Sequence, residues 1–142
     1  MTEQHWSGSG TAEDPWKLKT APLSSDFTIH RDDASDPALL VCQVGATRLT
    51  YLARAVEDLH AELLRRGEWV ALGAADEKKE PAPDSVEAWG RSADNPVGGW
   101  YGQRNGYRGR FGMYVPPLLE ALGLVELEHN PRNNRVRAIA QK

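Results

Sequence analysis

The sequence predicts an α+β fold, with a small antiparallel N-terminal sheet, one main helix, and a C-terminal half of shorter helices and a hairpin. Three observations lead to this prediction. Residues 26–52 contain three strand-like apolar segments, residues 53–66 repeat apolar positions at helical spacing, and residues 124–139 form two more strand-like segments around a turn. With 142 residues and 40% apolar content, the chain can bury one hydrophobic core.

We expect a single domain that follows a loose leader. Residues 1–25 are rich in glycine, serine and proline and show little apolar periodicity, with Trp16 and Leu18 as the side chains able to dock the leader. The single domain spans residues 26–142. Its parts are a meander with its helix (residues 26–72), an exposed connection (residues 73–84) and a winged part described below (residues 85–142).

The meander follows from the apolar patterns of three short segments. Phe27 and Ile29 alternate with polar neighbours in residues 26–31, residues 38–44 form an apolar run with β-branched valines, and residues 47–52 alternate again. Aspartates and a proline separate the first two segments, and a glycine separates the last two. An antiparallel three-stranded sheet is therefore expected.

Residues 53–66 are predicted to form the main helix. Apolar residues recur at steps of three and four, acidic residues come early, two arginines come late, and Gly67 follows as a stop. We expect its apolar stripe to close one face of the sheet. Residues 69–72 add a short apolar element.

Two shorter helices and a hairpin are predicted in the C-terminal half. Asp84 with Glu87 three residues later forms a capping box for a short helix. Prolines at 116 and 117 suit the first turn of a second helix, for which Gly123 is the stop. A turn at residues 129–134 then joins the strands of the hairpin.

Several classes of protein are disfavoured by what the sequence lacks. No apolar run approaches the roughly 20 residues that cross a bilayer, so we expect no membrane span. The first ten residues lack the pattern of a secretory signal, and Cys42 is the only cysteine, which favours a cytoplasmic protein without disulfides. Because Cys42 lies in an apolar run, we expect it to be buried in the core.

No catalytic, metal or cofactor site is predicted. The four histidines are scattered without paired spacing, and neither a phosphate-binding loop nor a dinucleotide fingerprint is present. We therefore predict no catalytic residue, no metal and no cofactor. An enzyme whose acid and base come from distant residues stays open as an alternative.

The charge is distributed unevenly along the chain. Residues 1–99 contain 10 Lys/Arg and 17 Asp/Glu, a net charge of −7, whereas residues 100–142 contain 7 and 3, a net charge of +4. A basic end can contact nucleic acid, or it can pack against the acidic part of the same chain.

Residues 118–139 resemble the end of a winged-helix regulator of the MarR type. A helix closes with a glycine, a Gly-Leu-Val-Glu strand follows, and a tip with proline and arginine returns to a strand. The resemblance implies a wing whose Arg132, Arg135 and Arg137 reach phosphates or a minor groove, with the preceding helix near the major groove. The alternative is an edge hairpin whose positive charge prevents pairing with other sheets.

Residues 98–114 interleave glycines with aromatic residues and arginines. This composition is typical of surfaces that bind single-stranded nucleic acid, where aromatic rings stack on bases and arginines hold phosphates. Arg104, Arg108 and Arg110 are the candidate contacts. The alternative is a tightly packed loop in which glycine makes room for buried aromatic rings.

Four segments together resemble a family of short actinobacterial proteins of unassigned function. They are residues 14–18, 86–92, 95–102 and 109–114. The resemblance implies a bacterial source and brings no activity and no functional residue.

The leading hypothesis is an uncharacterised, non-enzymatic protein that binds nucleic acid through its basic C-terminal hairpin. The rival hypothesis is a protein-interaction or accessory module, in which the tryptophan- and glycine-rich surface contacts a protein partner. The third hypothesis is an enzyme with an active site around residues 100–114.

Overall fold

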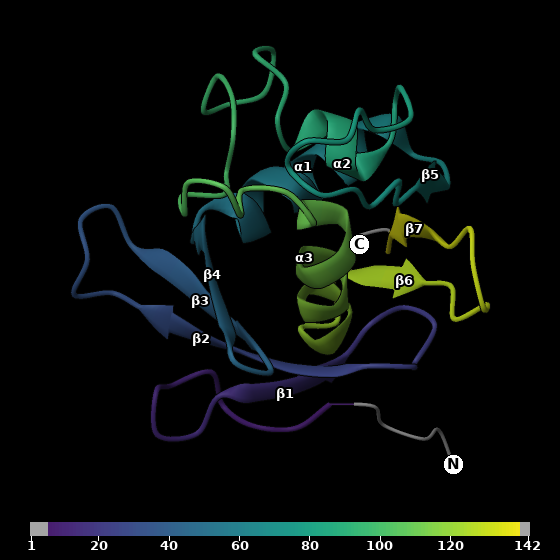
Figure 1. Cartoon of the computed structure of the whole chain (residues 1–142). Helices are drawn as coiled ribbons and strands as arrows, with labels where there is room; N and C mark the ends of the chain where they lie inside the picture. Colours follow the sequence, from purple (N-terminus) through teal and green to yellow (C-terminus); the bar gives the residue numbers. More distant parts are fainter. Residues whose placement is uncertain (1–5, 140–142) are drawn as a thin grey trace.

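The computed structural model describes residues 6–139, and residues 1–5 of the predicted leader lie outside this part. The described chain has a mixed α/β fold, with a four-stranded antiparallel sheet, a smaller three-stranded sheet and three helices (Figure 1). The elements in chain order are β1 (Trp16–Lys19), β2 (Asp26–Asp32), β3 (Leu39–Val44), β4 (Thr47–Leu52), α1 (Ala55–Arg66), β5 (Val70–Ala71), α2 (Val86–Trp89), α3 (Phe111–Ala121), β6 (Val125–Leu127) and β7 (Arg135–Ala138).

The larger sheet has the order β1-β2-β3-β4, which confirms the three predicted strands of the meander. Ile29, Cys42 and Leu49 are paired in register across β2, β3 and β4, and all three are buried. The fourth strand, β1, lies inside the stretch for which the sequence indicates only a loose leader. Leu18 of β1 is opposite Phe27 of β2, and this buried pair gives the short strand its place at the sheet edge.

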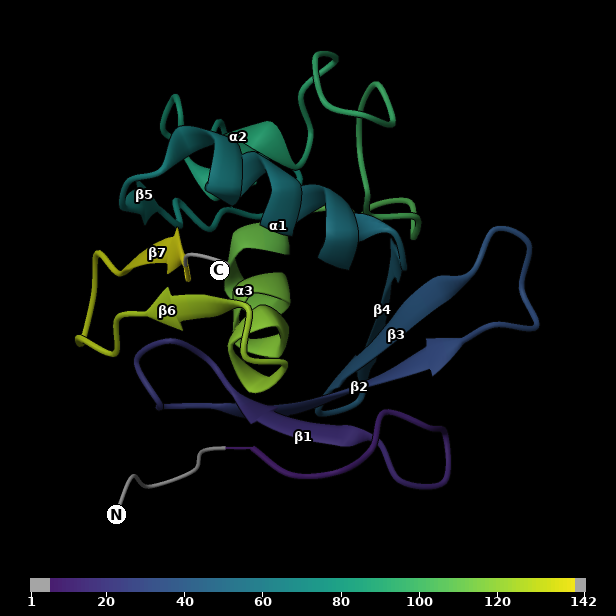
Figure 2. The same cartoon turned by 180° about the vertical axis from the view of Figure 1, so that it is seen from behind.

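The helix that covers the larger sheet is α3, whereas the sequence assigned this position to residues 53–66. Tyr114 of α3 packs edge-on against Phe27 with 4.9 Å between ring centroids, and Phe111 lies 6.0 Å from Tyr51. Figures 1 and 2 both show α3 between the larger sheet and the layer formed by α1 and α2. The main helix itself is confirmed as α1, and Gly67 ends it with φ of 64°.

α3 begins at Phe111, five residues before the predicted start at the two prolines. Pro116 and Pro117 therefore lie inside the helix, where each removes a backbone donor. Most of α3 is buried, and burial of its apolar side chains outweighs this local cost. Gly123 follows the helix with φ of 77°, as predicted for a stop.

The short helix α2 is confirmed, but its cap differs from the predicted one. Ser85 is the N-cap residue, and its hydroxyl accepts a hydrogen bond from the Ala88 N–H at 3.1 Å. The Glu87 side chain is not part of a capping box, since it is buried and points to other segments.

The smaller sheet has the order β5-β7-β6 and contains the predicted C-terminal hairpin. β5 corresponds to the predicted apolar element after the main helix. One cluster of buried apolar residues includes members of both sheets and all three helices. None of the helices in residues 6–139 is long and apolar enough to cross a membrane.

Candidate nucleic-acid interface

Two of the three predicted wing arginines are held by acidic residues of the same hairpin. Arg135 forms two hydrogen bonds with the Glu128 carboxylate, at 2.8 and 3.0 Å, and Arg137 lies 3.1 Å from Glu126. The hydrogen bond from Arg135 lowers the pKa of Glu128. Both guanidinium groups also lie over the Trp69 ring, 5.4 and 4.5 Å from its centroid. Their charge is therefore largely compensated within the protein.

Arg132 differs from its two neighbours. It is exposed in the turn between β6 and β7 and has no acidic partner among the residues that the structure describes. A single arginine without an acidic partner contributes little to the affinity for a polyanion.

The helix before the hairpin offers no free face for a major groove. α3 lies against β1 on one side and against α1 and α2 on the other, so the face expected to approach DNA is covered. Its buried residues are Phe111, Gly112, Tyr114, Val115, Pro116, Pro117, Leu118 and Leu119. The helix placement implied by the winged-helix resemblance therefore does not fit this structure.

The glycine- and aromatic-rich segment before α3 divides into a buried base and an exposed tip. Tyr101 is fully buried and stacks on Trp89 with 5.3 Å between ring centroids. The backbone of Gly102 lies against that of Arg108 so closely that a Cβ atom would not fit there. Gly109 is held by the buried Tyr51 hydroxyl, which donates to its carbonyl at 2.8 Å. The packed-loop alternative thus describes the base of this segment.

The tip, residues 103–107, is exposed and combines an arginine with an aromatic ring. The Arg104 guanidinium lies over the Tyr107 ring, 4.2 Å from its centroid, and donates to the Arg48 carbonyl at 2.6 Å. Tyr107 is 48% exposed. Arg104 has no acidic partner in residues 6–139. The Arg48 guanidinium donates instead to the Gln43 side chain at 3.3 Å. An aromatic ring and one uncompensated cation therefore lie together at the tip.

A pocket of about 250 Å³ adjoins Tyr107, and Lys78 and Arg110 line it. No ion pair with either cation is found in the described part of the chain. The two carboxylates in the same lining are already engaged. Glu77 pairs with Arg108 at 2.7 Å. Asp76 accepts the backbone N–H groups of Lys78 and Lys79, and since no ion pair with it is found in the described residues, its negative charge partly offsets the two cations of the lining.

Arg108, the third predicted contact of this segment, is less available than Arg104 and Arg110. Its hydrogen bonds to Glu77 lower the pKa of that carboxyl and raise the pKa of the guanidinium. Its guanidinium also lies 4.6 Å from the centroid of Trp100, which Arg91 approaches at 4.4 Å. These contacts make Arg108 part of the base that supports the tip.

The sequence was compared with known families, curated proteins and solved structures. A model of a family of unknown function, DUF6855, matches residues 8–139. The chain belongs to the DUF6855 family. No match was found among curated proteins or among solved structures. The family assignment confirms the expected membership of a family without an assigned function.

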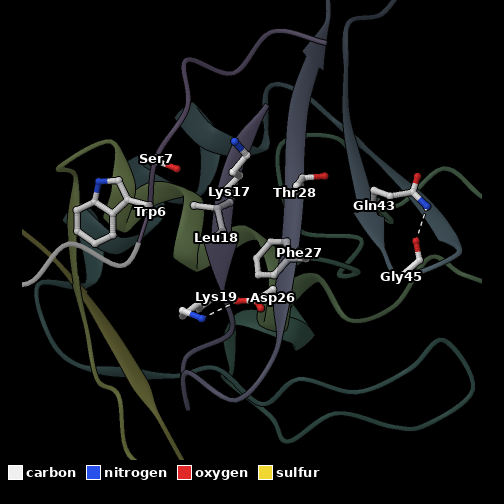
Figure 3. A pocket seen from close by; sticks show the side chains of 10 residues that line it. All are labelled: Trp6, Ser7, Lys17, Leu18, Lys19, Asp26, Phe27, Thr28, Gln43 and Gly45. Atoms are coloured by element: carbon white, nitrogen blue, oxygen red, sulfur yellow. Dashed lines mark hydrogen bonds and ion pairs between the residues drawn. The ribbon is translucent and has the colours of Figure 1, made fainter. Parts of the chain in front are cut away.

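Another cavity of this DUF6855 protein lies along β1 and β2 and has a volume of about 730 Å³ (Figure 3). Its charged groups do not converge on one point. Lys19 pairs with Asp26 at 2.6 Å, while the Lys17 side chain points away from that pair. A cavity with one uncompensated cation and no acid–base pair supports no specific chemistry.

Sequence reasoning found only part of the cluster around Tyr107 in this DUF6855 protein. Arg104 and Arg110 were among the predicted contacts, whereas Lys78 in the loop after β5 was not. Lys78 comes from a distant part of the sequence, so no local pattern links it to the tip. Within residues 6–139, no group of three or more potential metal ligands is found either.

Proposed function

We propose that this protein binds single-stranded nucleic acid at a surface made of Lys78, Arg104, Tyr107 and Arg110, which we call the tip surface. The main support is an exposed tyrosine with Arg104 over its ring and with Lys78 and Arg110 in the adjoining pocket, three cations that lack acidic partners in the described chain. Proteins that bind single strands combine these two features, since rings stack on bases and cations hold phosphates.

Single strands suit the tip surface better than a duplex does. A base can stack on Tyr107 or on the guanidinium plane of Arg104 only when it is unpaired and accessible. Duplex recognition by a helix in the major groove would need a free helix face, and α3 is covered by the larger sheet.

The element order from α1 to β7, with the sheet order β5-β7-β6, supports describing the C-terminal half as winged-helix-like. In this description β6 and β7 are the wing and α3 is the helix before it. Because α3 is buried and two wing arginines are paired, we assign the binding surface to the tip and not to the wing. Arg132 then makes at most a peripheral contact.

Two variants with the same change of net charge test this assignment. The tip variant carries Lys78→Ala, Arg104→Ala and Arg110→Ala, and the wing variant carries Arg132→Ala, Arg135→Ala and Arg137→Ala. Fluorescence anisotropy with a labelled mixed-sequence oligonucleotide, single-stranded or duplex, is measured at about 50 and 200 mM salt. We expect salt-sensitive binding to the single strand that the tip variant loses and the wing variant keeps.

Other outcomes would place the function elsewhere. Loss of binding in the wing variant alone would assign the interface to the hairpin. Absence of binding by the native protein to either form at low salt would reject the proposal. Tyr107→Ala adds a second measurement, because loss of one stacking contact is expected to cost about 1–3 kcal/mol without a change in the salt slope.

A further inference from the structure

A second cavity of the protein, which we call the groove, is independent of the tip surface and lies near β5. It is a cavity of about 690 Å³ bordered by the β1–β2 turn, the chain that follows β5, the start of α3 and the β6–β7 turn. Four segments that are distant in sequence thus form one continuous hollow, whose size falls in the range of ligand sites.

Most lining residues at the end of β5 and directly after it are small. Ala71, Gly73, Ala74 and Ala75 line one wall together with Leu72, and the partly buried Met113 lies at the start of α3. Small side chains allow the main chain of a ligand to approach the main chain of the wall. A methionine in the lining provides an apolar contact that adapts to different side chains.

The same wall presents backbone groups that have no partner in the described chain. The Leu72 N–H donates to the Asn134 carbonyl, and the alternation of an antiparallel ladder therefore turns the N–H and C=O of Ala71 away from β7. No hydrogen bond to the backbone of Gly73 or Ala74 is found in residues 6–139. An extended peptide can pair with such groups as an added strand beside β5.

The walls of the groove are held in place before any ligand binds. His129 donates from Nδ1 to the Ala21 carbonyl at 2.8 Å, which joins the β6–β7 turn to the β1–β2 turn. The buried Asn134 closes the β6–β7 turn through two hydrogen bonds with the Asn130 backbone, at 2.6 and 2.9 Å. A preformed groove reduces the entropy cost of binding.

The charge of the groove favours an acidic ligand. Arg132 and Lys79 are exposed in its lining, and neither has an acidic partner among the described residues. Arg135 is compensated by Glu128, and Glu80 is the only acidic side chain in the lining. The uncompensated charge is therefore positive.

We propose that this groove binds an extended acidic peptide segment of a partner protein, which pairs with the backbone at Ala71–Ala74 and places a carboxylate near Arg132 or Lys79. The proposal does not depend on the tip surface. It gives Arg132 a carboxylate partner in place of a phosphate.

Selection of random twelve-residue peptides displayed on phage, with the full chain as bait, tests the proposal. We expect enriched sequences with at least one Asp or Glu next to residues that favour an extended chain, and without proline in the central positions. A synthetic peptide of the enriched sequence is then titrated by calorimetry. Ala74→Trp, which fills the groove from an exposed position, is expected to weaken binding at least tenfold.

Two arginine variants separate a specific contact from general attraction. Arg132→Ala is expected to weaken binding about three- to tenfold, whereas Arg65→Ala, an equal charge change on the exposed side of α1, leaves it unchanged. Failure to enrich any sequence, or peptide binding that Ala74→Trp leaves intact, would overturn the proposal. Displacement of the peptide by the single-stranded oligonucleotide in the Lys78, Arg104, Arg110 variant would also overturn it, since the groove would then be a nucleic-acid site.

Discussion

The Glu87 carboxylate and the Arg91 guanidinium form an ion pair at 2.6 Å that is almost completely buried. Glu87 also accepts the N–H of Gly112 at 2.8 Å, at the start of α3. Arg91 donates to the carbonyls of Ala75 and Lys79, each at 3.1 Å. One pair of side chains, from α2 and from the residue after its C-cap, thus fixes both the start of α3 and the loop that carries Lys78 of the tip surface.

Replacement of Glu87 by glutamine is expected to destabilise the protein strongly. The Arg91 charge would stay buried without its partner, and loss of one member of such a pair costs about 3–5 kcal/mol. Urea unfolding followed by tryptophan fluorescence measures the change. Glu126→Gln is the matched control, because its pair with Arg137 is about half exposed and is expected to contribute less than about 1 kcal/mol. Equal losses in both variants would contradict the structural importance of the buried pair.

The Cys42 thiol is expected to be unreactive in the native protein. Cys42 is completely buried, and burial raises the pKa of its thiol well above the ordinary range. The reactive thiolate is therefore scarce and inaccessible at pH 8. Titration with a chromogenic disulfide reagent should show no reaction within the time in which a small thiol reacts completely, and one equivalent after addition of denaturant. Rapid reaction without denaturant would show that β3 opens readily.

The secondary structure was predictable where local pattern and burial agree. The strands of the meander, α1 with its glycine stop, and the C-terminal hairpin follow from alternation, helical spacing and turn residues. The start of α3 was not predictable, because Gly112 and the prolines at 116 and 117 disfavour a helix locally. Only burial between two layers stabilises it, and this packing is a property of the whole fold.

The same distinction applies to the candidate site. Arg104, Tyr107 and Arg110 are close in sequence, and their composition already indicated an interface. The ion pairs that compensate Arg108 and Arg135 join residues that no local pattern relates. Which arginines stay available for a ligand therefore depends on the tertiary structure. For this reason we place the proposed interface at the tip and not at the hairpin.

Acid is expected to loosen the base that supports the tip. Hydrogen bonds from Arg108 lower the pKa of Glu77 below its ordinary value, so the folded protein binds this proton less readily than the unfolded chain does. The stabilisation is present above the ordinary pKa of a glutamate and is lost as the pH falls through the lower value. Thermal unfolding between pH 7 and pH 3 should show a smaller acid-induced decrease in Arg108→Gln than in the native protein. An identical decrease would show that this pair does not contribute.

The hydrogen bond from Tyr51 to Gly109 is expected to link stability to ligand binding. The hydroxyl is buried, burial raises its pKa well above the ordinary value, and it donates to the Gly109 carbonyl next to Arg110. Tyr51→Phe leaves this buried carbonyl without a donor, and the expected cost is about 1–3 kcal/mol. Because Gly109 precedes Arg110 directly, we also expect weaker binding of the single-stranded oligonucleotide.

Tyr101→Phe is the matched control for this last prediction. Its hydroxyl donates to Asp58 of α1 at 2.8 Å, so the variant loses one comparable hydrogen bond on the side facing α1. We expect a similar loss of stability with unchanged affinity for the oligonucleotide. Equal weakening of binding in both variants would show that affinity follows global stability. Weakening in Tyr51→Phe alone would show that the position of the Gly109–Arg110 backbone sets the geometry of the tip surface, since neither tyrosine is among the proposed contacts.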